Sequence, residues 1–394
     1  MKVIDGGICS VKGVRSYGIK PGKMGLAVIV AEGNAAGVFT RNKVIAAPLI
    51  VTREALEKNG KLAAIIANSG NANAFTGEEG LADAREMASI LAGKLGVDSE
   101  LIGVASTGVI GRKLDVGWIN ENVGEVVDSL TSSAQGNSKA ARAIMTTDTV
   151  PKMAAVELSS NVCIGGIAKG SGMIEPNMGT MLGFVYTDAE VDSDVLDSCL
   201  KKAVDRTFNM IVVDGDTSTN DMVLLTATGA SGVRPDIDEF QQGLEHVLTD
   251  LAKQIAKDGE GATRLIEAQV NGAVSLEDAR LVAKAIVRSP LVKSAIFGKD
   301  PNWGRVVAAA GYSGADVDQS KISLAFSNGS DSAVLVDNGK IISEDSEMLG
   351  KLASIMGSPE VMIRVDLGIG DSSATAWGCD LTYDYVRINA EYTT

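Results

Sequence analysis

One stretch constrains this 394-residue chain more than any other: an irregular loop between two apolar runs. The loop, residues 169–180, reads KGSGMIEPNMGT, and the apolar segments 162–168 and 181–186 flank it. Glycine admits positive φ angles, and proline fixes φ and lacks a donor, so the loop must be irregular. Each flanking segment is short enough to be a buried strand. Thr180 is therefore expected where a loop becomes a strand, and the small Gly179 before it leaves its carbonyl open to attack.

This placement suits a threonine nucleophile that first cuts its own chain. A neutral hydroxyl needs an adjacent base, and the only histidine of the sequence is His246. In the helix expected over 236–257, His246 falls opposite the apolar stripe, on the solvent side. A serine–histidine–aspartate mechanism is therefore disfavoured. After cleavage between Gly179 and Thr180, the new α-amine, with a usual pKa of about 7.7–8.0, can act as the base. The stripe consists of Phe240, Leu244, Val247, Leu248, Leu251 and Ile255.

Composition excludes several classes of function. A net charge of −14 disfavours nucleic acid, because phosphates require a basic surface. The cysteines are widely spaced without a CxxC motif, so reduced thiols are expected rather than a zinc site. No apolar run is long enough to span a membrane, and no signal peptide is visible at the N-terminus, which predicts a cytoplasmic protein. The four cysteines are Cys9, Cys163, Cys199 and Cys379.

The chain is longer than a usual single domain, and its strands and helices alternate without a strict βαβ order. This pattern favours layered sheets with helices outside, an α/β fold rather than a barrel. We expect a main catalytic domain over 1–235, a small α/β unit over 236–290 and a C-terminal α/β domain over 291–394. Expected strands include 26–31 and 36–40 joined by a Gly-Asn turn, 62–68, 101–105, 152–158, 162–168, 222–228, 263–270, 361–368, 373–379 and one just after Pro290. Expected helices include 76–95, capped by Thr76, and 117–129, 138–145, 194–208, 276–288, 302–311, 344–356 and 383–390.

Six sequence blocks together carry a family resemblance. They are ANSGNAN at 67–73, STGVIG at 106–111, TTD at 146–148, the stretch 169–182, VDGDTSTND at 213–221 and NAEYTT at 389–394. The chain resembles the ornithine acetyltransferases of arginine biosynthesis, also called glutamate N-acetyltransferases, over essentially its whole length. One departure is Gly179, where alanine is expected more often. Both residues are small, so self-cleavage is still expected.

The resemblance implies a fold, a maturation step and an activity. The fold is the αββα sandwich shared with the β-peptidyl aminopeptidases. Cleavage after Gly179 would give chains 1–179 and 180–394, which the family suggests form an α2β2 heterotetramer. The enzyme would move the acetyl group of N-acetylornithine to glutamate through an acetyl-Thr180 intermediate, without a metal or organic cofactor. Whether acetyl-CoA is a second donor stays open. An aminopeptidase of the related fold and a glycine-rich small-molecule binding protein are the alternatives.

Two positions are expected to act at the acetyl carbonyl and the substrate carboxylate. Thr107-Gly108, at the end of the strand over 101–105, can offer a hydroxyl and a backbone N–H to an oxyanion. Such a pair alone is ordinarily a turn, and the resemblance is what favours the oxyanion role. Lys169 is either a surface lysine at a loop entrance or, as the resemblance implies, a fixed cation for a carboxylate.

Further substrate-binding positions follow from the resemblance alone. They are Thr146, Glu260, Asn389 and Thr394, together with Thr180 itself, and the adjacent Thr147 is an alternative to Thr146. Glu260 could contact the amino group of ornithine or glutamate, although a lone loop carboxylate is more often solvated surface.

The acidic segment 214–221 suggests a calcium loop but departs from the pattern. It lacks glycine at the sixth position and has Leu225 where a bidentate glutamate is required. Local hydrogen bonding of a tight loop is therefore the better interpretation.

Overall fold

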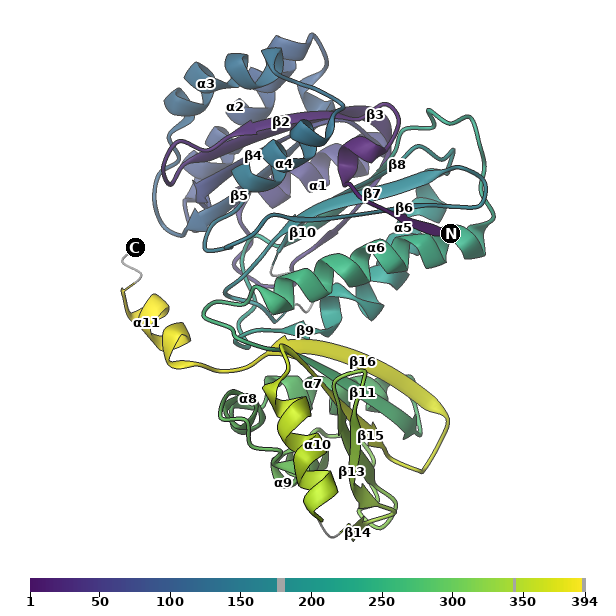
Figure 1. Ribbon diagram of the computed structural model, residues 1–394. Helices are drawn as coiled ribbons and strands as arrows, with labels where there is room; N and C mark the ends of the chain where they lie inside the picture. The colour runs from purple at the N-terminus through teal and green to yellow at the C-terminus, as the bar shows by residue number, and fades with distance from the viewer. Residues whose placement is uncertain (176–180, 343–344, 392–394) are drawn as a thin grey trace. The chain divides into compact units, whose positions relative to one another are not determined.

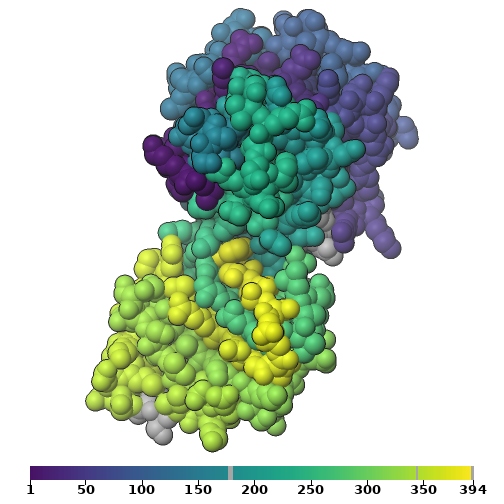
Figure 2. Space-filling model, turned by 90° about the vertical axis from the view of Figure 1, so that its right-hand side faces the viewer, coloured from purple at the N-terminus to yellow at the C-terminus, as the bar shows by residue number. Residues whose placement is uncertain are grey.

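The computed structural model describes residues 1–175, 181–342 and 345–391 (Figure 1). Its contacts divide the chain into two compact units. The first unit holds residues 1–209 and 216–251, and the second holds the described residues of 210–215 and 252–391. In the space-filling view, the first unit is coloured from purple to green and the second from green to yellow (Figure 2).

The first unit is built on a nine-stranded sheet. Its strand order is β1-β6-β7-β8-β10-β3-β4-β5, and β2 also pairs with β3. The apolar runs on both sides of the loop 169–180 form β7 and β8, which pair as an antiparallel hairpin. The strands are β1 (Lys2–Ile4), β2 (Arg15–Ile19), β3 (Gly25–Phe39), β4 (Lys61–Asn71), β5 (Ile102–Val109), β6 (Lys152–Glu157), β7 (Cys163–Lys169), β8 (Leu182–Thr187) and β10 (Met222–Ala227).

The long strand β3 connects the two halves of this sheet. The prediction of two strands joined by a turn at Gly33-Asn34 was wrong, because β3 runs through both residues. Its first half pairs with β4 and its second half with β10, and the register shifts between Val30 and Gly33. A Cβ at Gly33 would lie 2.0 Å from the carbonyl oxygen of Ala227, so glycine permits a close approach here rather than a turn.

The two halves of the sheet face each other across a shared core, with helices outside. Ile29 and Ile65 from one half and Phe184 and Leu224 from the other belong to the same buried cluster. A second cluster joins the opposite face of β3, β4 and β5 to α2 and α3 (Figure 1). On the outer face of β7, a Cβ at Gly166 would lie 2.9 Å from a methyl of the α6 residue Leu251. The layers are therefore helix, sheet, sheet, helix, as the αββα expectation requires.

The helices of the first unit agree with most of the sequence predictions. Helix α1, which was not predicted, begins with Pro48 in its first turn, where a missing N–H costs nothing. Thr76 precedes α2 as expected but does not cap it, since its hydroxyl donates to Asn73 Oδ1 at 2.8 Å. The helices are α1 (Ala47–Asn59), α2 (Gly77–Leu95), α3 (Val116–Asp128), α4 (Ala134–Ala143), α5 (Ser193–Arg206) and α6 (Ile237–Lys257), with short 3₁₀ turns η1 (Ile8–Ser10), η2 (Ser99–Leu101) and η3 (Phe208–Met210).

The second unit has a seven-stranded sheet in the order β14-β13-β12-β15-β11-β16-β9. The segment after Pro290 is helix α8 and not the expected strand, because Pro290 occupies its first turn and Ser289 Oγ accepts from Val292 N at 3.3 Å. The strands are β9 (Ile211–Val212), β11 (Leu265–Ala273), β12 (Ser323–Ser327), β13 (Ser332–Asp337), β14 (Lys340–Ile341), β15 (Glu360–Asp366) and β16 (Ser372–Cys379). The helices are α7 (Leu276–Arg288), α8 (Pro290–Phe297), α9 (Trp303–Gly311), α10 (Ser346–Gly357) and α11 (Tyr383–Glu391).

The unit boundary differs from the boundaries expected at 235 and 290. One boundary lies within α6, after Leu251, and the short segment 210–215 also belongs to the second unit. Strand β11 of the segment 236–290 pairs with both β15 and β16 of the segment 291–394. These two segments therefore contribute to one sheet, and backbone pairing is the reason that they form one unit.

The cysteines and the apolar character of the helices are two further features of the structure. All four cysteines are free thiols, as predicted. Among the described residues, we find no helix with the length and apolar character that crossing a membrane requires.

Candidate active site

Lys169 lies at the base of the hairpin formed by β7 and β8, where the segment expected to carry the nucleophile begins. It is the last residue of β7 and pairs with Leu182, the first residue of β8. Lys169 is only 7% exposed, so the interpretation as a surface lysine is wrong. The expected cleavage pair, Gly179 and Thr180, lies outside the described residues. The described chain resumes at the buried Met181, directly before β8.

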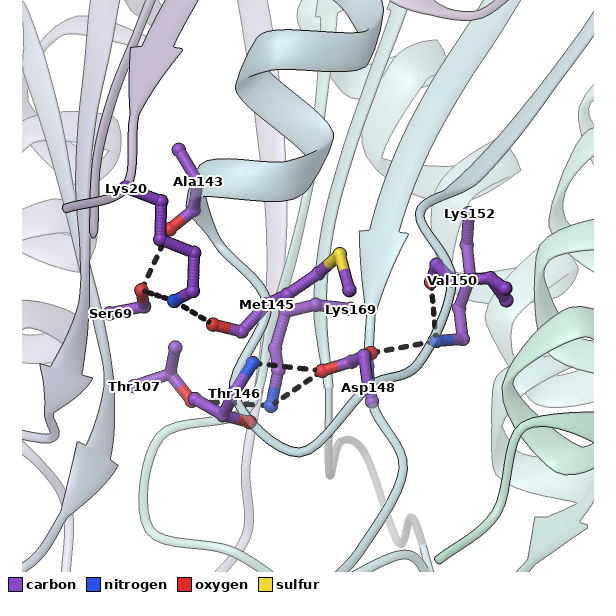
Figure 3. A network of polar contacts seen from close by, with 11 residues as sticks. Lys20, Ser69, Thr107, Ala143, Met145, Thr146, Asp148, Val150, Lys152 and Lys169 are labelled. Carbon is purple, nitrogen blue, oxygen red and sulfur yellow. Dashed lines mark hydrogen bonds and ion pairs between the residues drawn. The ribbon is translucent and has the colours of Figure 1, made fainter. Parts of the chain in front are cut away.

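Thr107 faces Lys169 across this site. Strand β5 was expected to end at residue 105 but continues to Val109, because β4 also continues and pairs with it as far as Asn71. Thr107 is 9% exposed, and Lys169 Nζ donates to its hydroxyl oxygen at 3.4 Å (Figure 3). An ammonium only donates hydrogen bonds. The hydroxyl oxygen therefore acts as the acceptor in this contact, and the hydroxyl hydrogen can be donated to another group.

Gly108 has a conformation that favours glycine. Its φ is +134°, and a Cβ at this position would lie 2.3 Å from the carbonyl carbon of Gly70 and 2.5 Å from Asn71 N. A side chain here would force β4 and β5 apart. The glycine thus preserves the strand pairing that holds Thr107 in place.

Asp148 organises the polar groups behind Lys169. Its side chain is fully buried, and it accepts hydrogen bonds from Thr146 N (3.0 Å), Gly170 N (2.7 Å) and Lys152 Nζ (2.7 Å). Lys169 Nζ lies 4.0 Å from Oδ2 of Asp148 (Figure 3). Burial by itself would raise the pKa of Asp148, but Lys169, Lys152 and the hydrogen bonds outweigh it and lower the pKa to about 2. Asp148 is thus an anion at neutral pH.

Thr146 is brought to the same site through its backbone. It is half-buried, and its bond to Asp148 places it beside Lys169 and Thr107 (Figure 3). Thr147 is also half-buried. The structure therefore joins three predicted residues, Thr107, Thr146 and Lys169, from separate parts of the sequence.

Lys20 is a further cation at the site that sequence reasoning missed. Its ammonium donates to Ser69 Oγ at 2.9 Å and to Met145 O at 2.7 Å (Figure 3). Burial lowers the pKa of Lys20, Asp148 opposes this effect, and Lys169 adds to it. Ser69 is the register partner of Thr107 and belongs to a quoted sequence block, whereas no motif marked Lys20.

The acidic loop 214–221 supports strand β5. Asn220 Nδ2 donates to Ser106 O at 2.9 Å and to Ala72 O at 2.6 Å. One local bond agrees with the tight-loop interpretation, since Asn220 N donates to Ser218 Oγ at 3.1 Å. Asn220 also makes contacts that are distant in sequence, and one of them fixes the carbonyl of Ser106, which directly precedes Thr107.

Two predicted substrate-binding residues meet in the second unit. Asn389 Nδ2, on the exposed face of α11, donates to Glu260 Oε2 at 2.8 Å. The loop that carries Glu260 approaches the start of α11 closely. A Cβ at Gly261 (φ +70°) would lie 2.6 Å from Tyr385 N. Thr382 Oγ1 also donates a hydrogen bond to Gly261 O at 2.7 Å. This C-terminal segment lies at the surface of its unit (Figure 2). Thr394 lies outside the described residues.

Burial also tests the apolar stripe expected in the helix over 236–257. The six apolar stripe residues of α6 are completely buried, as predicted, and His246 on the other side is half-buried. Within residues 1–175, 181–342 and 345–391, no three His, Cys, Asp or Glu side chains gather as a metal site would require.

Comparison with known proteins identifies the family. The model of the ArgJ family matches residues 11–394. The chain belongs to the ArgJ family. Glutamate N-acetyltransferase of Methanosarcina mazei is 65% identical over the full length of both chains. The arginine biosynthesis bifunctional protein ArgJ of Archaeoglobus fulgidus is 49% identical, over 98% of this chain and 100% of its own.

A solved structure of the ArgJ family also matches. The crystal structure of the arginine biosynthesis bifunctional protein ArgJ from Bacillus halodurans is 46% identical, with a TM-score of 0.50. The match covers 53% of this chain and 98% of the solved chain. The family resemblance inferred from the six blocks is thus confirmed, and the enzyme expected from it is the one named for these ArgJ relatives.

Proposed function

We propose that this chain is a glutamate N-acetyltransferase of arginine biosynthesis, which transfers the acetyl group of N-acetylornithine to glutamate. Two observations support the proposal: full-length membership in the ArgJ family, and the contact of Thr107 with Lys169 at the base of the hairpin that carries Thr180. The contact is the observation that carries it. It places a hydroxyl donor and a cation together at the entrance of the loop, as acetyl transfer between amino acids requires.

Maturation is the first step of the proposed mechanism. Thr180 Oγ attacks the carbonyl carbon of Gly179, the C–N bond between the residues breaks, and water hydrolyses the resulting ester. The products are chains 1–179 and 180–394, and Thr180 now carries a free α-amine.

The acetyl group then passes through Thr180. Its hydroxyl attacks the acetyl carbonyl, the α-amine takes the hydroxyl proton and returns it to the leaving amine, and ornithine departs. Thr107 Oγ1–H and the Gly108 N–H stabilise the oxyanion. Glutamate enters the same site, and its amine attacks the acetyl ester to give N-acetylglutamate. The cycle needs no metal or organic cofactor, and acetyl-CoA is a candidate second donor.

Substrate recognition follows from charge. Lys169, a buried cation, pairs with the substrate carboxylate, and Thr146 lies beside it. Glu260, held by Asn389, is suited to an amino group, and Thr394 completes the predicted set. We propose that the cleaved chains remain together as an α2β2 heterotetramer in the cytoplasm.

An N-terminal-nucleophile aminopeptidase of the related fold is the alternative. It would use Thr180 in the same way but would have no need of Lys169 as a carboxylate clamp. The burial of Lys169 and the names of the full-length relatives favour the acetyltransferase.

Mass spectrometry and an activity assay test the proposal together. Purified protein should contain a fragment that begins Thr180-Met181-Leu182 and should form N-acetylglutamate from N-acetylornithine and glutamate. A parallel assay with acetyl-CoA as donor decides whether the enzyme is bifunctional. Peptide hydrolysis without acetyl transfer would support the aminopeptidase instead, and active protein that is entirely full-length would contradict the mechanism.

A further inference from the structure

Side chains bind the main chain of β5 along one of its edges. Strand β5 is last in the order of its sheet, with β4 as its neighbour. On the other edge, Val104 N donates to Thr52 Oγ1 and this hydroxyl donates to Val104 O, both at 2.7 Å. Ser106 O accepts from Asn220 Nδ2 at 2.9 Å on the same edge. The main-chain groups of every second residue in a strand point to the same side, so the Gly108 N–H is directed to this edge as well.

Asn220 holds the chain on both sides of the pair Thr107-Gly108. Its Nδ2 donates to Ser106 O at 2.9 Å and to Ala72 O at 2.6 Å. Ala72 N in turn donates to Val109 O at 2.9 Å. Ser106 directly precedes the pair and Val109 directly follows it. One amide group is therefore linked to both neighbours of the pair, to the first directly and to the second through Ala72.

The amide of Asn220 is itself held in one orientation. The residue is 5% exposed, and its Oδ1 accepts from Thr219 Oγ1 at 2.5 Å. An asparagine side chain has two N–H donors on its nitrogen, and the two carbonyls of Ser106 and Ala72 accept from this nitrogen. A flip of the amide would turn its oxygen toward two carbonyl oxygens. The hydrogen bonds thus fix which end of the side chain faces β4 and β5.

We infer that Asn220 is a positioning residue for acetyl transfer: through Ser106 and Ala72, it holds the Thr107 hydroxyl and the Gly108 N–H in the geometry that stabilises the oxyanion. The inference rests on the proposed function, in which this pair supplies the two donors. Such donors are effective when they lie about 2.7–3.1 Å from the developing oxyanion. A displacement of about 1 Å can cost about a hundredfold in rate, so the support of the pair affects the rate as well as the fold.

The test is a double-mutant cycle between Asn220→Ala and Thr107→Ala, measured on protein that has been cleaved before Thr180. The control is Asn59→Ala on α1, because the Asn59 amide also donates to two main-chain carbonyls, Ala55 O at 3.3 Å and Glu100 O at 3.0 Å. The measured quantities are kcat and KM for N-acetylornithine at saturating glutamate. Rates are divided by the amount of the fragment that begins at Thr180.

Asn220→Ala should lower kcat by about tenfold to a hundredfold and should leave KM within about threefold of wild type, because the donors act mainly in the transition state. Thr107→Ala should cost about two to three orders of magnitude in the wild-type background. In the Asn220→Ala background its cost should be at least about tenfold smaller, because the hydroxyl that it removes is already displaced. Asn59→Ala should keep the wild-type kcat.

The cycle also separates positioning from general damage. A cost of Thr107→Ala that is equal in both backgrounds would overturn the inference, because Asn220 would then act independently of the oxyanion donors. A wild-type kcat in Asn220→Ala, beside a slow Thr107→Ala, would overturn the inference and leave the proposed function intact. If Thr107→Ala keeps the wild-type kcat, the proposed oxyanion role fails and the inference falls with it. If Asn220→Ala does not fold, Asn220→Asp, which has nearly the same size but lacks the two N–H donors, replaces it under the same criteria.

Discussion

The ammonium of Lys169 lies 3.4 Å from the hydroxyl oxygen of Thr107, although the two residues are 62 positions apart in the chain. Lys169 ends β7 and Thr107 lies near the end of β5, which are in opposite halves of the folded sheet. The layered fold thus brings a hydroxyl donor and a buried cation to one place. Because the ammonium donates to Thr107, the hydroxyl hydrogen is left to stabilise negative charge elsewhere.

Thr107→Ala should slow acetyl transfer by about two to three orders of magnitude, because it removes one donor to the oxyanion. The KM for N-acetylornithine should change little, since this donor acts mainly in the transition state. Steady-state kinetics with N-acetylornithine and glutamate provide the measurement, and Thr107→Ser, which keeps the hydroxyl, should retain most of the rate. A large rise in KM at unchanged kcat would mean that Thr107 contacts the substrate in its ground state.

Gly108→Ala should be far more damaging than its size suggests. The new Cβ would meet the backbone of Gly70 at 2.3 Å in a backbone conformation that side chains rarely adopt. We expect loss of activity and a lower free energy of unfolding, measured by chemical denaturation. Gly93→Ala on α2 is the matched control, because a Cβ there meets nothing within 4 Å and alanine is the better helix former by about 1 kcal/mol. Equal stability of the two variants would show that β4 and β5 can adjust.

Sequence reasoning predicted individual elements well where the apolar pattern was strong. The stripe of α6 is buried as expected, and the hairpin of β7 and β8 lies where its apolar runs placed it. The interruption at Gly33-Asn34 was misleading, because a glycine between apolar runs indicates either a turn or a close backbone approach. Only the position of Ala227 distinguishes these, and it is remote in sequence.

The candidate site was predicted in part. Thr107, Thr146 and Lys169 meet in the structure. Asp148, which accepts a hydrogen bond from Thr146 N and attracts Lys169, was noted in the sequence only as part of the block at 146–148. An aspartate beside two threonines has the same sequence signature whether it is solvated or buried. Its burial depends on β6, β7 and the loop before them coming together, which is tertiary information.

Acid should destabilise the protein through Asp148. Its pKa of about 2 in the folded chain is below the usual value of about 3.9 expected when unfolded. The resulting stabilisation is fully present above about pH 4 and is lost as pH falls toward 2. The pKa difference corresponds to about 2–3 kcal/mol. The free energy of unfolding should therefore fall more steeply between pH 5 and pH 2 in wild type than in Asp148→Asn. Identical slopes would show that Asp148 is equally acidic in the unfolded chain.

Asn389→Ala should weaken substrate binding without weakening the fold. It removes the 2.8 Å bond to Glu260 from an exposed helix, so the change in the free energy of unfolding should be within about 0.5 kcal/mol. If Glu260 holds an amino group, the KM for N-acetylornithine should rise several-fold. Arg387→Ala is the control on the same helix, because Arg387 forms an exposed ion pair with Asp384 at 2.9 Å. An unchanged KM in Asn389→Ala would remove Asn389 from the proposed binding set.

Substitution of Thr180 separates its two proposed roles. Thr180→Ala has no hydroxyl, so neither self-cleavage nor the acetyl-enzyme can form. The protein should migrate as one intact chain, remain folded because only a small side chain is altered, and transfer no acetyl group. Thr180→Ser keeps the hydroxyl but loses the methyl group that restricts χ1. It should cleave more slowly and retain reduced activity.

The acetyl-enzyme itself can be observed in cleaved wild type. Incubation with N-acetylornithine and no acceptor should add one acetyl group to the fragment that begins at Thr180, and glutamate should then remove it. Intact-mass and peptide mass spectrometry locate the group, and Thr180→Ala treated in the same way is the blank. An acetyl group on another residue, or substantial transfer by Thr180→Ala, would assign the chemistry to a different nucleophile.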